Sequence, residues 1–106
     1  MLENGRYFFM VFMCHLVIEK LLKAFIVERE GVNPPRIHNL VALATRTKMI
    51  VPGEHCALIN ELNTMSVVTR YPDGRRALAN TLDSRRAAAL YEKTKGCAQW
   101  LRQELS

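Results

Sequence analysis

Residues 7–24 read YFFMVFMCHLVIEKLLKA, and this stretch decides the fold. Every residue from Phe8 to Phe12 is apolar, whereas charged side chains recur at helical spacing between Glu19 and Lys23. A helix that is apolar on more than one side needs other elements to cover it. The stretch therefore predicts a helix over residues 3–30 that is central to the fold or covered by a partner subunit.

Loop signals divide the rest of the chain: GVNPP at 31–35, PG at 52–53 and YPDG at 71–74. Between these signals, apolar residues keep helical spacing and almost never alternate strictly. We predict four helices, running from Glu3 to Glu30, from Ile37 to about Lys48, from Pro52 onward and from Asp83 onward. The sequence thus predicts an all-α fold, an antiparallel up-and-down bundle of four to five helices, in a single domain over residues 1–106.

Two glycines, Gly74 and Gly96, indicate the local structure around them. Pro72 at the second position and Gly74 at the fourth favour a type I turn over Tyr71–Gly74. Gly96 lies inside the last predicted helix, where it costs roughly 1 kcal/mol relative to alanine. A close contact with another helix, or a bend, would explain a glycine at that position.

Composition limits the class of protein. Of 106 residues, 49% are hydrophobic and 24% are charged, which is typical of a globular domain. The first apolar run is broken by His15 and is shorter than the roughly 20 residues of a membrane span. Three cysteines without a Cys-x-x-Cys pair favour a reducing compartment and supply no zinc motif. We expect a soluble, cytoplasmic protein with no membrane partner.

Basic residues suggest an anionic partner. The net charge is +5, and ten of the fifteen basic residues are arginine, whose guanidinium group binds phosphate well. The densest basic stretch runs from Arg70 to Arg76 and continues at Arg85 and Arg86. Tyr71 within it offers a ring on which a base can stack. The alternative is a solvated turn whose arginines pair with nearby acids.

The first predicted helix carries polar residues one turn apart. Glu19 and Lys23 are either a surface ion pair worth about 0.2–0.5 kcal/mol or place a lysine at the mouth of an anion site. His15 and Glu19 have the spacing of two metal ligands, but two ligands do not make a site. A mostly buried histidine bonded to a carboxylate is the favoured interpretation, and we predict no metal.

Arg36 and His38 follow a double proline and open the second predicted helix. A helix start attracts anions through its free N–H groups, and both side chains would add to this. The alternative is that Asn39 or the loop caps the helix while His38 only anchors it to a neighbour. The chain has no nucleophile elbow and no phosphate-binding glycine loop, so we predict no cofactor.

Three of these stretches resemble the HEPN domain family. Residues 15–24 (HLVIEKLLKA) are similar to the EK-x-x-KA first long helix of that family, and residues 35–43 (PRIHNLVAL) to its H-[DN]-L-x-x-L second helix. Residues 70–73 (RYPD) match the motif that closes the third helix. The motifs occur in family order and together span essentially the whole chain.

The resemblance implies a helical bundle, usually a homodimer, that binds nucleotides or RNA. It also implies pairing with a minimal nucleotidyltransferase in a toxin–antitoxin-like pair. The recurrent polar residues of the family fall on Glu19, Lys20, Lys23, His38, Arg70, Tyr71 and Asp73. From these we predict a nucleotide- or anion-binding site at Lys20, Lys23, His38, Arg70, Tyr71 and Asp73.

The resemblance also bears on catalysis. Many HEPN proteins are metal-independent ribonucleases with four to six residues between an arginine and a following histidine. In this sequence the pairs Arg6/His15, Arg29/His38 and Arg46/His55 each enclose eight residues. We therefore predict a non-catalytic binding protein. The alternatives are a ribonuclease that uses Arg70 and His38, brought together by the fold or across a dimer, and a pure protein-interaction module.

Overall fold

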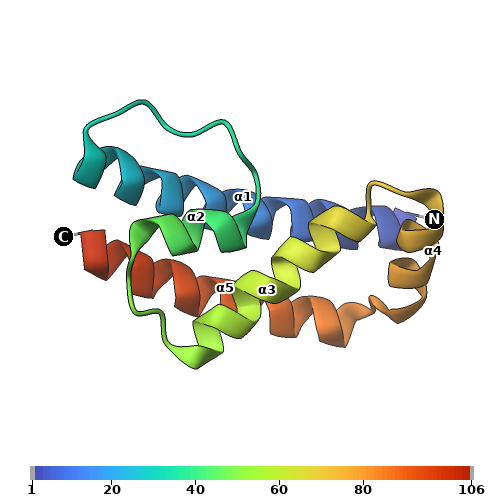
Figure 1. The fold of residues 1–106 in the computed structure, drawn as a ribbon. Coiled ribbons are helices and arrows are strands. Elements are labelled where there is room, and N and C mark those ends of the chain that lie inside the picture. Colours follow the sequence, from blue (N-terminus) through green and yellow to red (C-terminus); the bar gives the residue numbers. More distant parts are fainter. Residues whose placement is uncertain (1, 106) are drawn as a thin grey trace.

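The computed structural model describes the backbone of residues 2–105 and the side chains of residues 6–105. Within this range the chain forms five helices (Figure 1). They are α1 (Leu2–Glu30), α2 (Leu40–Thr47), α3 (Gly53–Val68), α4 (Pro72–Thr81) and α5 (Ser84–Leu105). The predicted all-α fold of four to five helices is confirmed. Among the described residues, we find no helix with the length and apolar character to span a membrane.

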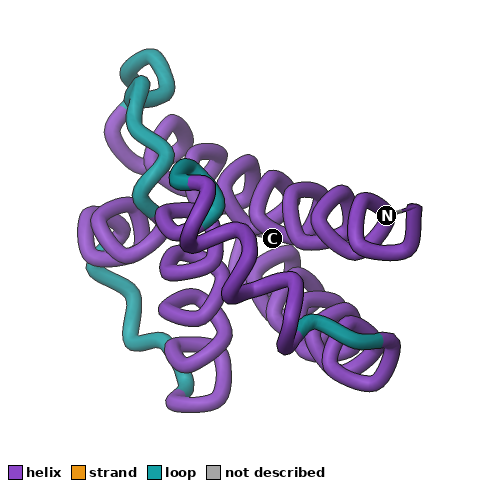
Figure 2. The backbone as a smooth tube through the Cα atoms, turned by 90° about the vertical axis from the view of Figure 1, so that its right-hand side faces the viewer, coloured by secondary structure: helices purple, strands orange, loops and turns teal. Residues whose placement is uncertain are grey.

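The long helices alternate in direction along the chain. In Figure 1, α1 and α5 lie side by side, and α3 runs obliquely across them in the opposite sense. The short helix α2 packs against both α1 and α3. The loop of residues 31–39 arches outward from the end of α1 before it returns to α2 (Figure 1 and Figure 2). This return brings the start of α2 back over the middle of α1.

The second half of α1 is the centre of the core. Ile18 and Leu22 are completely buried, because α2, α3 and α5 all contact this helix. The first half is covered less well: Phe9 and Phe12 remain 64% and 59% exposed. The predicted apolar stripes of the other helices are buried at Leu40, Leu43, Leu58, Leu62, Met65, Leu90, Cys97 and Leu101, whereas their members Ala44, Val68 and Leu105 are only partly buried.

Capping side chains set where two helices begin. The Asn39 side chain accepts a hydrogen bond from the Ala42 N–H at 3.0 Å, so α2 starts after Asn39. The predicted start at Ile37 is therefore wrong. Asp83 accepts from the Arg86 N–H at 2.8 Å and caps α5, so this helix begins next to Asp83, where the sequence predicted its start.

The predicted type I turn over Tyr71–Gly74 is wrong, because these residues open helix α4. Pro72 occupies the first helical position, where its fixed φ suits the helix and its missing N–H costs nothing. The first turn of a helix has nearly the dihedral angles of a type I turn. Here the hydrogen bonds continue, since the Arg75 N–H donates to the Tyr71 carbonyl at 2.9 Å.

The two glycines have opposite surroundings. A Cβ added to Gly74 would overlap the backbone carbonyl of Val68, so the glycine lets the α4 start pack against the end of α3. A Cβ added to Gly96 meets nothing within 4 Å. The close helix contact predicted at Gly96 is therefore wrong.

We expect Gly74→Ala to lower the free energy of unfolding by about 1–3 kcal/mol through overpacking. Gly96→Ala should raise it by about 1 kcal/mol, because alanine favours the helix and finds free space. Urea unfolding followed by circular dichroism measures both. Equal effects of the two substitutions would contradict this packing of α4 on α3.

Candidate functional site

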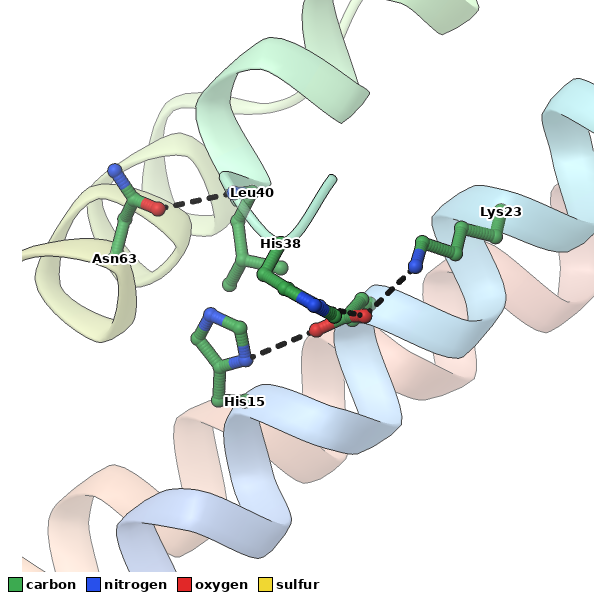
Figure 3. Close-up of polar contacts among 6 residues, drawn as sticks. His15, Lys23, His38, Leu40 and Asn63 are labelled. Carbon is green, nitrogen blue, oxygen red and sulfur yellow. Dashed lines mark hydrogen bonds and ion pairs between the residues drawn. The ribbon is translucent and has the colours of Figure 1, made fainter. Parts of the chain in front are cut away.

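The side chains of His15, Lys23 and His38 point toward one carboxylate (Figure 3), which belongs to Glu19 of α1, a residue only 5% exposed. Its Oε2 accepts hydrogen bonds from Lys23 Nζ at 2.9 Å and from His38 Nδ1 at 2.8 Å. Its Oε1 lies 3.4 Å from His15 Nδ1. The predicted Glu19–Lys23 pair therefore forms, but it is part-buried and shared with two histidines. The prediction that His15 is buried beside a carboxylate is confirmed.

The partners of Glu19 keep it ionised. Burial alone would raise the pKa of its carboxyl group. The hydrogen bonds from Lys23 and His38 and the positive charge of Lys23 outweigh burial, so the pKa lies below its ordinary value. At neutral pH, Glu19 is thus a carboxylate that only accepts hydrogen bonds.

His38 is held from two sides, although its side chain is 66% exposed. Glu19 binds its Nδ1, and two residues later the Leu40 N–H donates to Asn63 Oδ1 of α3 at 2.9 Å (Figure 3). Because Nδ1 faces a carboxylate, it carries the proton and leaves the Nε2 lone pair of the neutral ring available. A histidine oriented by a carboxylate in this way can bind an anion when protonated or act as a base when neutral.

Two grooves meet at His38. The larger, about 860 Å³, lies between the second half of α1 and the loop of residues 31–39. Its polar lining consists of Lys20, Lys23, Glu28, Asn33, Arg36 and His38. The smaller, about 260 Å³, lies between the end of this loop and the last turns of α3, and its polar lining consists of Arg36, His38, Asn39, Asn63, Ser66 and Arg70. Because Arg36 and His38 line both, the two grooves adjoin each other at these side chains.

The charges of three groove residues are not neutralised within the described part of the chain. Lys20, Arg36 and Arg70 form no ion pair or hydrogen bond there through their side chains. Cationic side chains without an acidic partner are available to phosphate or carboxylate groups. The grooves therefore form a surface suited to an anion, with Glu19 balancing charge beneath it.

The structure brings together four of the six predicted binding residues, namely Lys20, Lys23, His38 and Arg70. The other two lie apart from both grooves. Tyr71 precedes α4 and is 64% exposed. Asp73 lies in the first turn of α4, where a carboxylate favours the positive end of the helix.

The basic stretch after α3 divides into residues with different surroundings. Arg70 and Arg75 line pockets and have no ion-pair partner within residues 6–105. Arg86 instead donates to Thr81 Oγ1 at 2.8 Å and lies 3.7 Å from Glu61. Local pairing thus applies to Arg86, whereas Arg70 stays available at the smaller groove.

The predicted site omits several polar groove residues, of which Arg36 and Asn63 matter most to the geometry. Arg36 lines both grooves, and its place directly after a double proline was the available signal. Asn63 fastens the start of α2 to α3. An amide next to Leu62 in an apolar stripe is a weak signal, because the sequence does not show which backbone group it will meet.

The fold and site define a small helical bundle with a basic groove around an oriented histidine. A family model for the HEPN domain matches residues 1–104, so the chain belongs to the HEPN domain family. No curated protein and no solved structure shows significant similarity to the chain. Family membership indicates a function related to nucleotides or RNA. Among the described residues, no group of His, Cys, Asp or Glu side chains is arranged to hold a metal ion.

Burial lowers the pKa of His15 from its ordinary value of 6.5. The charge of Glu19 and a hydrogen bond with the His38 backbone act in the opposite direction, but the effect of burial is larger. Below this value the unfolded chain takes up a proton that the folded chain resists. We expect the free energy of unfolding to fall as the pH drops below 6.5, and His15→Gln to remove this part of the decline. Urea unfolding between about pH 5.5 and 7.5 measures it. An equal decline in both proteins would contradict the assignment to His15.

Proposed function

We propose that this HEPN protein binds nucleotides or RNA through the two grooves around His38. Lys20, Lys23, Arg36 and Arg70 supply the positive charge, and the protein acts as a non-catalytic partner of a nucleotidyltransferase. Tyr71 and Asp73 stay predictions of the same site, and we expect Tyr71 to stack on a base only in a ligand that extends beyond the grooves.

One observation carries the proposal: unpaired cations lie on both sides of a histidine that a buried carboxylate orients. Lys20 and Arg36 line the larger groove, and Arg70 lines the smaller one. Phosphate oxygens accept several charge-assisted hydrogen bonds at once, and guanidinium groups match this geometry. A phosphate between Arg36 and Arg70 would also lie beside His38.

We expect Arg70→Ala to weaken binding of ATP and of a short single-stranded RNA by roughly tenfold or more, because a charge-assisted hydrogen bond is lost. The slope of log affinity against log salt should also fall by about one. Fluorescence anisotropy at two salt concentrations measures both. The matched control is Arg76→Ala, because Arg76 is an exposed arginine that lines neither groove. Equal affinities for the two variants would contradict the site.

Pairing with a nucleotidyltransferase, in a toxin–antitoxin-like system, rests on family membership. Co-expression of the chain with a nucleotidyltransferase encoded beside it, followed by size-exclusion chromatography, tests the pairing. A complex supports the proposal, and separate elution of the two proteins at micromolar concentration counts against it.

A second candidate function, metal-independent RNA cleavage, is favoured by one specific observation. His38 and Arg70 line the same groove, although 32 positions separate them in the sequence. The Glu19–His38 pair supplies an oriented base for the 2′-hydroxyl group, and Arg70 supplies a cation for the phosphate. The sequence lacks the arginine–histidine spacing of the ribonucleases in this family. His38 and Arg70 are far apart in the sequence but line one groove, and this supports the candidate.

If the protein cleaves RNA, His38→Ala should lower the rate by about 10²–10⁴-fold, the usual contribution of a general base. The assay is cleavage of single-stranded RNA in the presence of EDTA. His55→Ala is the control, since His55 lies beside Trp100 and outside both grooves. No cleavage by the unmodified protein would remove this candidate and leave the binding function.

We also propose a homodimer formed through the exposed apolar side of α1. Phe9 and Met13 are one turn apart and are 64% and 39% exposed. Large exposed apolar side chains on one helix are typical of interaction surfaces. Phe9→Glu should shift the protein to a monomer in sedimentation equilibrium, whereas Ile50→Glu, at a 94% exposed loop position, should not. An unmodified protein that is monomeric at micromolar concentration would contradict the dimer.

A further inference from the structure

A separate pocket of about 230 Å³ lies between the first half of α1 and the end of α3. Phe8 and Phe12 form its apolar side, together with Val11. His15, Ser66, Thr69 and Arg75 contribute its polar groups. Apolar walls with a few polar groups are the usual composition of small-molecule sites. The volume is below the about 300–1,000 Å³ of sites for drug-sized ligands, so it suits a single ring system.

Two polar groups of this pocket have no partner within the described structure, although the Thr69 hydroxyl donates to the Ser66 carbonyl at 3.0 Å and His15 Nδ1 lies beside Glu19. His15 is more than nine-tenths buried, and its Nε2 has no hydrogen-bond partner among the described residues. A buried polar atom without a partner costs free energy that a ligand can recover. Arg75 is exposed and forms no ion pair within residues 6–105. The pocket is therefore lined by a histidine with one unpartnered ring nitrogen and by a guanidinium group that has no ion-pair partner among the described residues.

The pocket adjoins the groove that we assign to phosphate. Ser66 lines both, and the consecutive residues Thr69 and Arg70 line one each. A ligand with an anionic group at Arg70 can thus reach the pocket with a neighbouring ring.

We propose that this pocket is a nucleobase subsite, in which a base stacks between Phe12 and the Arg75 guanidinium group with its polar edge toward His15. Bases stack readily on phenylalanine rings and on guanidinium planes. The inference rests on the proposed function, because it assigns the base of the nucleotide or RNA whose phosphate lies at Arg70. It also gives His15 a role beyond its contact with Glu19.

The test compares ligands with and without a base. Protein labelled with ¹⁵N-histidine is titrated with the four nucleoside 5′-monophosphates, the four nucleosides and ribose 5-phosphate. We expect at least one nucleotide to bind roughly tenfold more tightly than ribose 5-phosphate, the size of one base stack. The ring ¹⁵N resonances of His15 should shift with that nucleotide and with its nucleoside, but not with ribose 5-phosphate.

Variants separate the base from the phosphate. Phe12→Ala should remove the preference for nucleotide over ribose 5-phosphate, whereas Tyr91→Ala should keep it. Tyr91 is a matched control because it is 52% exposed, against 59% for Phe12, and does not line this pocket. Arg70→Ala should weaken the binding of nucleotides and of ribose 5-phosphate by the same factor.

Each outcome has a distinct meaning. If ribose 5-phosphate binds as tightly as every nucleotide and the His15 signals do not move, the base subsite is overturned. The phosphate site is then retained. Nucleosides that shift His15, with no phosphate-dependent binding, support the subsite and overturn the proposed phosphate site. No binding and no shift with any of the ligands overturns both.

Discussion

The buried carboxylate of Glu19 is the interaction on which the rest of the site depends. An ionised group is costly to bury unless it is paired and hydrogen-bonded, and removing one partner of a buried pair generally costs about 3–5 kcal/mol. Here Lys23 and His38 share one oxygen, and His15 lies beside the other. Of these partners, only His38 comes from outside α1. The carboxylate therefore ties the loop of residues 31–39 to the central helix.

Through the Glu19–His38 hydrogen bond, the proposed site is built on α1, the helix that also forms the centre of the core. One face of α1 carries Ile18 and Leu22 into the centre of the bundle, and the neighbouring face carries the polar cluster. A rigid helix positions a site more precisely than a loop does. His38, which lies on a loop, gains this precision from Glu19 on one side and from the bond between Leu40 and Asn63 on the other. The two basic grooves and the nucleobase subsite are then arranged along α1 and α3.

Much of the fold was predictable because it depends on local sequence patterns. The extent of α1, the cap at Asp83 and the buried stripes follow from apolar spacing and from helix-start chemistry. The errors occurred where a local signal has two outcomes. Pro72 opens a turn and a helix equally well, and only the continued hydrogen bonds and the packing of Gly74 on Val68 decide for the helix. Gly96 likewise faces open space instead of another helix.

The sequence by itself determined the helical bundle, the HEPN resemblance and most of the residues that carry positive charge, because these are properties of composition and short-range spacing. Only the tertiary structure decided that Glu19 is buried, that Arg36 and Asn63 belong to the site, and that Tyr71 and Asp73 lie outside the grooves. The reason is that the loop of residues 31–39 reverses the path of the chain. His38 and Arg70 line the same groove because this loop leads back to α1 and is held there by long-range hydrogen bonds, which no local sequence pattern encodes.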